Sequence, residues 1–485
     1  MVSVVRGALW LVRNIIWINI ILAGAIVFFE RRNPKSTWLW LMVLTFLPGI
    51  GFILYLVLGQ DLSKKKIFTA KRLDDLQMSH IAEAQQDFIR EKRYKFKSED
   101  YYKHLGLINM HLESSQSVLT QDNELRLYFD GREKFQALID EINGAKEYVL
   151  LQYYIIKSDG LGMAVIDALC RKAEEGVRVK VLYDGMGGRN LSKEAIEKMK
   201  ASGVQIAAFF PPFASKLTLR INYRNHRKIC VVDGRVGFVG GFNIGDEYIG
   251  LNKRFGYWRD THLKIRGSAV RWLQWRFLLD WRFSYNEADP EIYKTPITDD
   301  GRGDSGVQIV SSGPDSKWPS VKDGYLKMIS EAKERIYIET PYFIPDDALL
   351  EALRLAGISG LDVRIMIPDK PDHPFVYWAS LSYIGELLQS GVKCYTYGKG
   401  FLHSKVVIMD DFVSSVGTAN MDIRSFDLNF EVNAFIYDRD INKQLGDKFI
   451  EDIELCREIR LEDYRKRSNI VKIKESFSRL LSPIL

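Results

Sequence analysis

The sequence predicts an α/β protein made of two tandem α-β-α sandwich repeats with approximate twofold symmetry, preceded by a two-helix transmembrane hairpin. Three observations lead to this prediction: two long apolar stretches at the N-terminus, an internal repeat, and a charged motif that occurs once in each copy of the repeat. The length of 485 residues is enough for about three domains.

The composition excludes several classes of protein. Lys and Arg exceed Asp and Glu by 68 − 62 = 6, a mild basic bias that suits anionic partners but is too small for a protein that coats nucleic acid. A hydrophobic fraction of 46% excludes a disordered chain. The four cysteines form no C-x-x-C pair, so we expect neither a disulfide framework nor a zinc site. The soluble part is therefore expected in a reducing compartment.

The N-terminal hairpin is predicted within residues 1–60, with spans at about 7–29 and 37–58. At 1.5 Å per residue each stretch is long enough to cross a hydrocarbon layer of about 30 Å. The charged segment between them contains Pro34 and cannot stay in lipid, so both ends face the same side. The basic residues after the second span favour a cytoplasmic location for the rest of the chain. A cleaved signal peptide is disfavoured because a second apolar span follows directly.

The internal repeat begins after residues 61–115, which we interpret as a linker or stalk. Three segments return at offsets of 187, 184 and 188 residues: 142–152 as 329–339, 176–182 as 360–366, and 202–204 as 390–392. Each copy alternates helical patches with short runs of β-branched and aromatic residues, the pattern of an α/β sandwich with a largely parallel sheet. The first repeat is assigned to residues 116–295 and the second to residues 296–485.

The first copy carries an insertion. The separation from Val204 to His226 is 22 residues, against 11 from Val392 to His403. The inserted segment is rich in aromatics, prolines and cations, and either contacts anionic headgroups or is a surface loop without a role. Its candidate substrate-binding residues are Lys216, Arg220 and Arg224.

The charged motif is H-x-K-x4-D followed by G-x-x-N. Its candidate catalytic and supporting residues are His226, Lys228, Asp233 and Asn243 in the first copy, and His403, Lys405, Asp410 and Asn420 in the second. With Lys and Asp each near 6% of an average composition, the seven histidines would give about 0.03 matches by chance. Two matches at equivalent points of a repeat are therefore meaningful.

The spacing of the motif indicates phosphodiester chemistry. A His and a Lys two residues apart on a strand point to the same face, and twofold symmetry brings both pairs to one point. Two imidazoles and two ammonium groups then surround one anionic centre. One histidine can attack phosphorus while the other protonates the leaving alcohol, and the lysines stabilise the charge on the phosphate oxygens. This chemistry needs no metal and no cofactor.

Carboxylates are expected to orient the two imidazoles, because a nucleophilic imidazole needs an acceptor on its other nitrogen. Asp260 and Glu431 occupy matching positions on the strand after each motif, although a surface ion pair is the alternative for either. The motif aspartates, Asp233 and Asp410, end their strands and are expected to anchor turns. The asparagines, Asn243 and Asn420, either bond phosphate oxygens or brace the loop.

The duplicated motif resembles that of the phospholipase D superfamily. The hairpin with Glu30 to Pro34, the segment Trp258 to His262 and the ending Arg479 to Leu485 are similar to the bacterial cardiolipin synthase branch, and the likeness covers essentially the whole chain. One departure is Gly241, where many members have Ser, so no hydroxyl is available at this position.

This resemblance implies transesterification of two phosphatidylglycerols to cardiolipin and glycerol through a phosphatidyl-histidine. By analogy His226 is the nucleophile and His403 the acid and then the base, although the order could be reversed. The implied partners are anionic phospholipids and the bilayer, with no nucleic acid, and the implied location is the bacterial cytoplasmic membrane, as a multi-pass protein with a cytoplasmic catalytic domain. The alternatives are a phospholipase D-type hydrolase or another phosphatidyltransferase of the superfamily.

The sequence also predicts two further helices and the roles of four more histidines. Residues 270–283 are expected to be a helix that packs in the core or touches headgroups. The amphipathic C-terminal helix either lies on anionic lipid or docks on the domain. Four further histidines show no metal spacing and are expected at the surface or in packing: His80, His104, His111 and His373.

Overall fold

The computed structural model describes residues 17, 20–24, 34–47, 51, 55, 75–210, 223–285 and 303–482. They fall into two compact units. The first contains α2 (Pro34–Phe46), from which Trp40 packs edge to face against Tyr55 at 5.4 Å. Most of the two predicted spans lies outside the described residues, and among the described residues no helix combines the length and the apolar character needed to cross a membrane.

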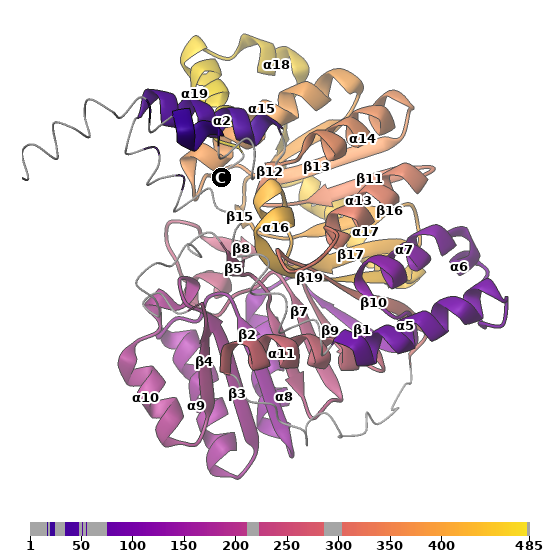
Figure 1. The fold of residues 1–485 in the computed structure, drawn as a ribbon, viewed down its shortest axis with the longest axis vertical. Helices are drawn as coiled ribbons and strands as arrows, with labels where there is room; N and C mark the ends of the chain where they lie inside the picture. Colours follow the sequence, from indigo (N-terminus) through magenta and orange to yellow (C-terminus); the bar gives the residue numbers. More distant parts are fainter. Residues whose placement is uncertain are drawn as a thin grey trace, which may run out of the picture. The chain divides into compact units, whose positions relative to one another are not determined.

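The second unit contains both repeats in one continuous sheet (Figure 1). The strands of the first repeat run outward in the order β1 (Thr120–Tyr128), β9 (His262–Arg266), β7 (Val236–Gly240), β6 (Ile229–Val232), β2 (Tyr148–Tyr153), β3 (Arg178–Asp184), β4 (Gln205–Phe209). Those of the second run in the order β10 (Ser305–Ser312), β19 (Asn429–Tyr437), β17 (Val413–Gly417), β16 (Val406–Met409), β11 (Arg335–Glu339), β13 (Asp362–Pro368), β14 (Lys393–Tyr397), β20 (Cys456–Glu458). The halves join through antiparallel β1 and β10, so the strand order is symmetric about this pair.

The sheet is mixed, which corrects the expectation of a largely parallel sheet. Along the strand order given above, parallel neighbours are confined to β2, β3 and β4 and, likewise, to β11, β13 and β14. The central strands are antiparallel because each motif strand turns directly into its neighbour. The turn after β6 places Asp233 at φ 51° and Gly234 at φ 65°, and Asp410 occupies the same place after β16 at φ 48°. Asp tolerates this left-handed conformation better than most residues.

Helices cover both faces of the sheet (Figure 1). The first repeat contributes α8 (Gly131–Gly144), α9 (Gly160–Glu174), α10 (Lys193–Ala201) and α11 (Ala269–Tyr285), and the second contributes α13 (Ser320–Glu331), α14 (Asp347–Ile358), α15 (Pro374–Leu387), α16 (Ile423–Asp427) and α17 (Arg439–Ile453). The short α18 (Leu461–Lys466) and α19 (Asn469–Leu480) end the described chain. Equivalent aspartates begin two of the helices: Asp159 caps α9 and Asp346 caps α14.

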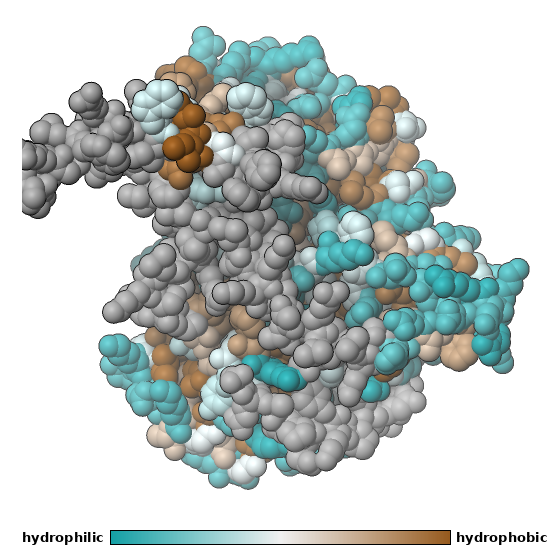
Figure 2. Space-filling view, in the orientation of Figure 1, coloured by the Kyte–Doolittle hydropathy of each residue, from teal (hydrophilic) through white to brown (hydrophobic). Residues whose placement is uncertain are grey.

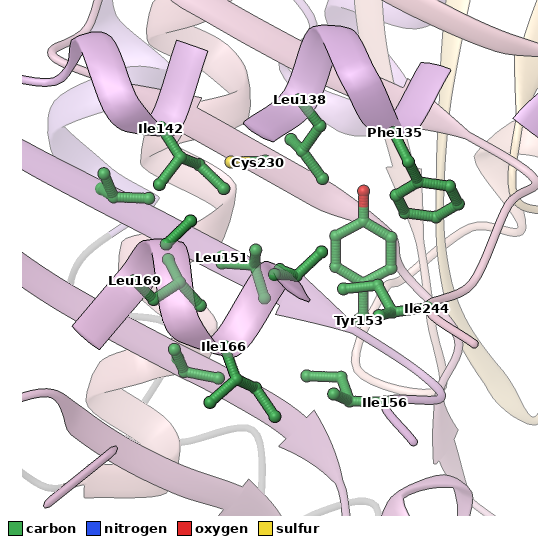
Figure 3. Close-up of a cluster of buried hydrophobic side chains, with 14 of the residues drawn as sticks. Phe135, Leu138, Ile142, Leu151, Tyr153, Ile156, Ile166, Leu169, Cys230 and Ile244 are labelled. Atoms are coloured by element: carbon green, nitrogen blue, oxygen red, sulfur yellow. The ribbon is translucent and has the colours of Figure 1, made fainter. Parts of the chain in front are cut away.

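The core of the first repeat lies between α8, α9 and the sheet (Figure 3). Leu138 and Ile142 of α8 meet Leu151 of β2, and all three are fully buried. The other face of the strands is covered by α11, in which Trp281 is 1% exposed. The interpretation of residues 270–283 as a core helix is therefore confirmed.

Residues 75–115, part of the segment 61–115 interpreted as a linker or stalk, fold into helices, the last of which packs against the second repeat. They form α5 (Asp75–Arg90), α6 (Asp100–Lys103) and α7 (Leu105–Ser115), and α7 packs against β10 and α13. The apolar face of α7 includes the fully buried Leu107 and Ile108. His111 is a packing residue: it lies 4.2 Å from the Phe435 ring, and burial lowers its pKa to about 3.

Candidate active site

Each motif histidine directly follows a short strand that pairs with the other repeat. The short strand β5 (Arg224–Asn225) runs parallel to β19, and the His226 N–H that follows donates to Phe430 O at 3.0 Å. In the second copy β15 (Gly400–Leu402) runs parallel to β8 (Tyr257–Arg259), and the His403 N–H donates to Arg259 O at 2.7 Å. The backbone of each histidine is thus anchored on the opposite repeat.

Each imidazole also contacts a carboxylate that belongs to the opposite repeat. Nδ1 of His226 lies 3.0 Å from both carboxylate oxygens of Glu431, and Nδ1 of His403 lies 2.6 Å from Oδ2 of Asp260. An Nδ1–H that donates to a carboxylate leaves the Nε2 lone pair of a neutral imidazole free to react. Their matching positions in the two copies identify these two carboxylates from the sequence. The sequence does not indicate that each contacts the histidine of the other copy.

Burial determines the charge of the imidazoles. It lowers the pKa of His226, against the opposing effect of the Glu431 charge, and it lowers the pKa of His403 to about 3. Both imidazoles are therefore neutral near pH 7 in the absence of substrate. An anionic phosphodiester bound between them would favour the protonated form of one, since an opposite charge nearby raises the pKa of a histidine.

The ammonium group of each motif lysine lies beside the histidine of its own motif. Nζ of Lys228 donates to His226 O at 2.6 Å, and Nζ of Lys405 donates to His403 O. Each ammonium has three donors, so further N–H groups can bind the oxygens of an anion. Burial lowers the pKa of both side chains, that of Lys405 to about 8. The site thus concentrates buried cationic and imidazole groups, as a phosphodiester requires.

Three residues that the sequence analysis missed hold the carboxylates in place. Thr418 Oγ1 donates to Glu431 at 2.6 Å, and Asn429 Nδ2 donates to the same carboxylate at 3.2 Å. The Thr261 N–H donates to Asp260 at 2.8 Å. Thr418 lies inside the second G-x-x-N segment, directly after its glycine, so its place in the motif is the signal that could have identified it.

Gly241 corresponds to Thr418 in the first copy, and the structure gives a reason for its lack of a side chain. A Cβ at Gly241 would lie 1.9 Å from Asp260 Oδ1 and 2.6 Å from its Cγ. Asp260 therefore occupies the space that a side chain at residue 241 would need. The absence of a side chain at residue 241 thus leaves room for Asp260 in the position from which it contacts His403.

Substitution Gly241→Ala is expected to lower kcat by about 100-fold, because displacing Asp260 removes the orienting partner of a catalytic imidazole. Phosphodiester turnover is measured together with circular dichroism, which should show a folded protein. Gly144→Ala is the matched control, since a Cβ there meets nothing within 4 Å. An unchanged kcat in Gly241→Ala would contradict the assignment of Asp260.

Two buried arginines brace the strands that carry the carboxylates. Nη1 of Arg227 bonds the Asp280 carboxylate at 2.6 and 2.8 Å, and its Nε donates to Glu431 O at 3.1 Å. Arg259 bonds Asp452 at 2.6 Å and donates to Asp260 O at 2.8 Å. The arginines thus fix the backbone at each carboxylate. Their aspartate partners lie on α11 and α17, the helices that follow β9 and β19, which a comparison of the two copies could have revealed. Arg259 also donates to Glu339 of β11 at 3.1 Å.

The motif aspartates lie at the opposite ends of their strands from the histidines. Asp233 accepts three backbone N–H groups of residues 146–148, each at 2.8 Å. Asp410 likewise accepts the N–H groups of residues 333–335. Both carboxylates anchor turns, as their positions predicted, and their inclusion among the catalytic candidates is corrected accordingly.

The other candidates differ in their placement. Asn243 Oδ1 accepts the Ile155 N–H at 3.1 Å, which favours the bracing alternative. Asn420 is 5% exposed, and its Oδ1 has no hydrogen-bond partner among the described residues. Arg224 is buried in β5, whereas Lys216 and Arg220 lie outside the described residues. In the part of the chain that the structure describes, no group of three His, Cys, Asp or Glu side chains could hold a metal ion.

Comparisons with known proteins agree with this arrangement. The chain matches the family described as cardiolipin synthase, phospholipase D-like domain, over residues 138–257 and 325–453, and the phospholipase D-nuclease N-terminal family over residues 17–60. It is 49% identical to the major cardiolipin synthase ClsA of Bacillus subtilis, covering 96% of this chain and 97% of that one. It is 50% identical to cardiolipin synthase 2 of Staphylococcus epidermidis, covering 96% of both chains.

Among solved structures, the fold is similar to that of phosphatidylserine synthase from Haemophilus influenzae. The TM-score is 0.58 and the identity 17%, over 80% of this chain and 100% of that one. At this identity the likeness concerns the fold alone.

Proposed function

Because the chain belongs to the cardiolipin synthase family of phospholipase D-like proteins, we propose that it transfers a phosphatidyl group between two phosphatidylglycerol molecules, giving cardiolipin and glycerol. The resemblance inferred from the duplicated motif is confirmed by these matches. The observation that carries the chemistry is the pair of buried imidazoles, each with Nδ1 at a carboxylate and Nε2 left for reaction.

In the first step Nε2 of His226 attacks the phosphorus of the donor lipid. A P–N bond forms, the P–O bond to glycerol breaks, and the protonated Nε2 of His403 gives its proton to the leaving oxygen. Lys228 and Lys405 stabilise the charge on the non-bridging oxygens. In the second step a glycerol hydroxyl of the acceptor gives its proton to His403 and attacks phosphorus, and the P–N bond breaks. One phosphodiester replaces another, so no nucleotide is consumed.

The proposed location is the bacterial cytoplasmic membrane, through the hairpin within residues 1–60 and with the catalytic unit on the cytoplasmic side. The support is the uncharged stretch 37–58, the apolar stretch 7–29 and the match of residues 17–60 to an N-terminal family. Lys216, Arg220 and Arg224 are the candidates for contact with anionic headgroups.

The function is tested with the full chain in vesicles that contain two phosphatidylglycerols with different acyl chains. Mass spectrometry is expected to find mixed and homogeneous cardiolipins together with an equal amount of free glycerol. Phosphatidic acid as the sole product would overturn the proposal in favour of a hydrolase, which uses the same residues but admits water. Adding phosphatidylethanolamine with a third acyl composition reports whether another lipid serves as donor or acceptor.

The lysine pKa shifts predict the alkaline limb of the pH profile. A Lys405 with a pKa of about 8 is charged below that pH and loses its charge as the pH rises through it, so kcat/KM for the anionic donor is expected to fall tenfold per unit above about pH 8. Lys405→Arg keeps its charge, so it should be slower, and the part of the decline that belongs to Lys405 should be absent between about pH 7 and 9.5. The same alkaline decline in Lys405→Arg would show that another group titrates.

A further inference from the structure

The C-terminal helix α19 exposes its apolar face. Ile470, Ile473, Phe477 and Leu480 are 67%, 68%, 55% and 69% exposed. Their spacing of three and four residues places them on one side of the helix. A helix that packs on a soluble domain normally turns this side inward, so the orientation of α19 requires an explanation.

Polar contacts fix this orientation. Glu475 is 2% exposed and accepts hydrogen bonds from Arg467 at 2.8 and 3.0 Å, and Arg479 donates to Glu386 of α15 at 2.8 Å. The helix therefore attaches to the second repeat through its charged side, which packs against α15. The four apolar side chains on the other side of the helix keep more than half of their surface exposed.

The surroundings of this face favour an anionic lipid surface. Lys472 and Lys474 are exposed beside the apolar residues, and Lys474 Nζ lies 5.2 Å from the Trp378 ring. Phe375, which is 52% exposed, extends the apolar face from α15, with its ring 6.5 Å from that of Phe477. Lysines and aromatics beside an apolar helix face are typical of helices that lie in a membrane interface. A second copy would bring like charges together.

The N-terminal turn of α15, which carries Phe375, lies at the end of the second repeat where the charge of Asp372 acts on Lys405. The N-terminal turn of α15 follows Asp372, which accepts a hydrogen bond from the Tyr342 hydroxyl and lines a small pocket with Tyr342 and Tyr377. The charge of Asp372 also acts on Lys405, where it opposes the effect of burial. Phe375 thus extends the exposed face of α19 toward the part of the second repeat whose charge acts on Lys405. Figure 2 shows hydrophobic residues among hydrophilic ones on the surface around α14, another helix of the second repeat.

We propose that the apolar face of α19, together with Phe375, inserts into the surface of an anionic bilayer and holds the active-site entrance against the membrane. This inference rests on the proposed function, because a lipid substrate keeps its acyl chains in the bilayer while its phosphate reaches the imidazoles. Docking at this face lets lipids enter and leave without passing through water.

The docking is tested in the full chain, reconstituted in phosphatidylglycerol vesicles with a nitroxide at residue 473 or 477. All labelled variants carry Cys456→Ser, because Cys456 is the one cysteine among the four that is not fully buried. A nitroxide in lipid is reached by oxygen and shielded from a water-soluble nickel chelate, and we expect this result at both positions. The control is residue 450 on α17, whose side chain is 42% exposed and should be reached by the chelate.

Two outcomes would overturn the docking. Access of the chelate at residues 473 and 477 equal to that at 450 would mean that the face lies in water. Shielding from both reagents would mean that protein covers it, either a second copy or another segment of this chain. These measurements do not depend on turnover, so they remain valid if the wild-type protein makes no cardiolipin, a result that contradicts the proposed function instead.

A functional readout uses Phe477→Asp with Ile450→Asp as the matched control. Placing a carboxylate in the inserted face should lower cardiolipin formation on phosphatidylglycerol vesicles about tenfold, through loss of apolar burial and repulsion from anionic lipid. In detergent micelles, where substrate reaches the site without a bilayer, the rate should match that of the wild type. An equal loss in both media would indicate damage to the fold and contradict a docking role, and no loss on vesicles would contradict it as well.

Discussion

Substitution of either motif histidine by alanine is expected to abolish cardiolipin formation from phosphatidylglycerol, with rates at least about 10⁴-fold below that of the wild type. The reason is that the two imidazoles act in one sequence: without His226 no P–N bond forms, and without His403 the glycerol oxygen leaves without a proton. Both side chains are about 90% buried and both bond a carboxylate, so removing either also leaves a charge without its partner. Vesicle assays with mass spectrometry measure the loss.

An activated donor separates the roles of the two histidines. A phosphatidyl ester of p-nitrophenol needs no proton on its leaving group, because the phenolate is stable. With this donor His403→Ala should release p-nitrophenol and accumulate phosphatidyl-protein, whereas His226→Ala should remain inactive. The reverse pattern would exchange the assignments, and inactivity of both variants on this donor would contradict a division into nucleophile and acid. Circular dichroism of each variant checks that the protein is folded.

The sequence was informative about the site because the chain contains its own comparison. Two copies of one motif select the histidines, lysines and matching acids without any alignment of relatives, and the structure brings His226, His403, Asp260 and Glu431 into one place. What the copies cannot reveal is the connection between them. The crossed contacts depend on β1 and β10 joining the sheets and on β5 and β15 pairing with the opposite repeat. Such long-range pairings leave no local periodicity.

The features that the sequence analysis predicted wrongly or missed also have specific physical causes. A run of β-branched residues buried on both faces is typical of parallel strands, but β6, β7, β16 and β17 are buried and antiparallel, because helices cover both faces of a sheet joined by tight turns. Residues 75–115 have mixed charge and no motif, so nothing in their pattern predicted that Leu107 and Ile108 complete a core against α13. Asp280 and Asp452 escaped notice because each lies among several other charged residues on its helix.

Substitution of the crossed carboxylates should have the second largest effect, since each holds an imidazole in its reactive tautomer. Glu431→Gln and Asp260→Asn preserve shape but present an amide to Nδ1, and a loss of about 10³- to 10⁴-fold in kcat is expected for each on phosphatidylglycerol. Glu334→Gln, at an exposed position, is the matched control and should be fully active.

The p-nitrophenyl donor also tests whether each carboxylate orients the histidine of the opposite repeat. In a His403→Ala background, where p-nitrophenol release depends on His226 alone, Asp260→Asn should cost nothing further because its partner imidazole is absent. Glu431→Gln should still slow the reaction by about the full 10³-fold, since Glu431 orients the remaining nucleophile. If each carboxylate served the histidine of its own repeat, these two results would be exchanged. The pair of double variants therefore distinguishes a site shared between the repeats from two sites placed side by side, without reference to the absolute rates.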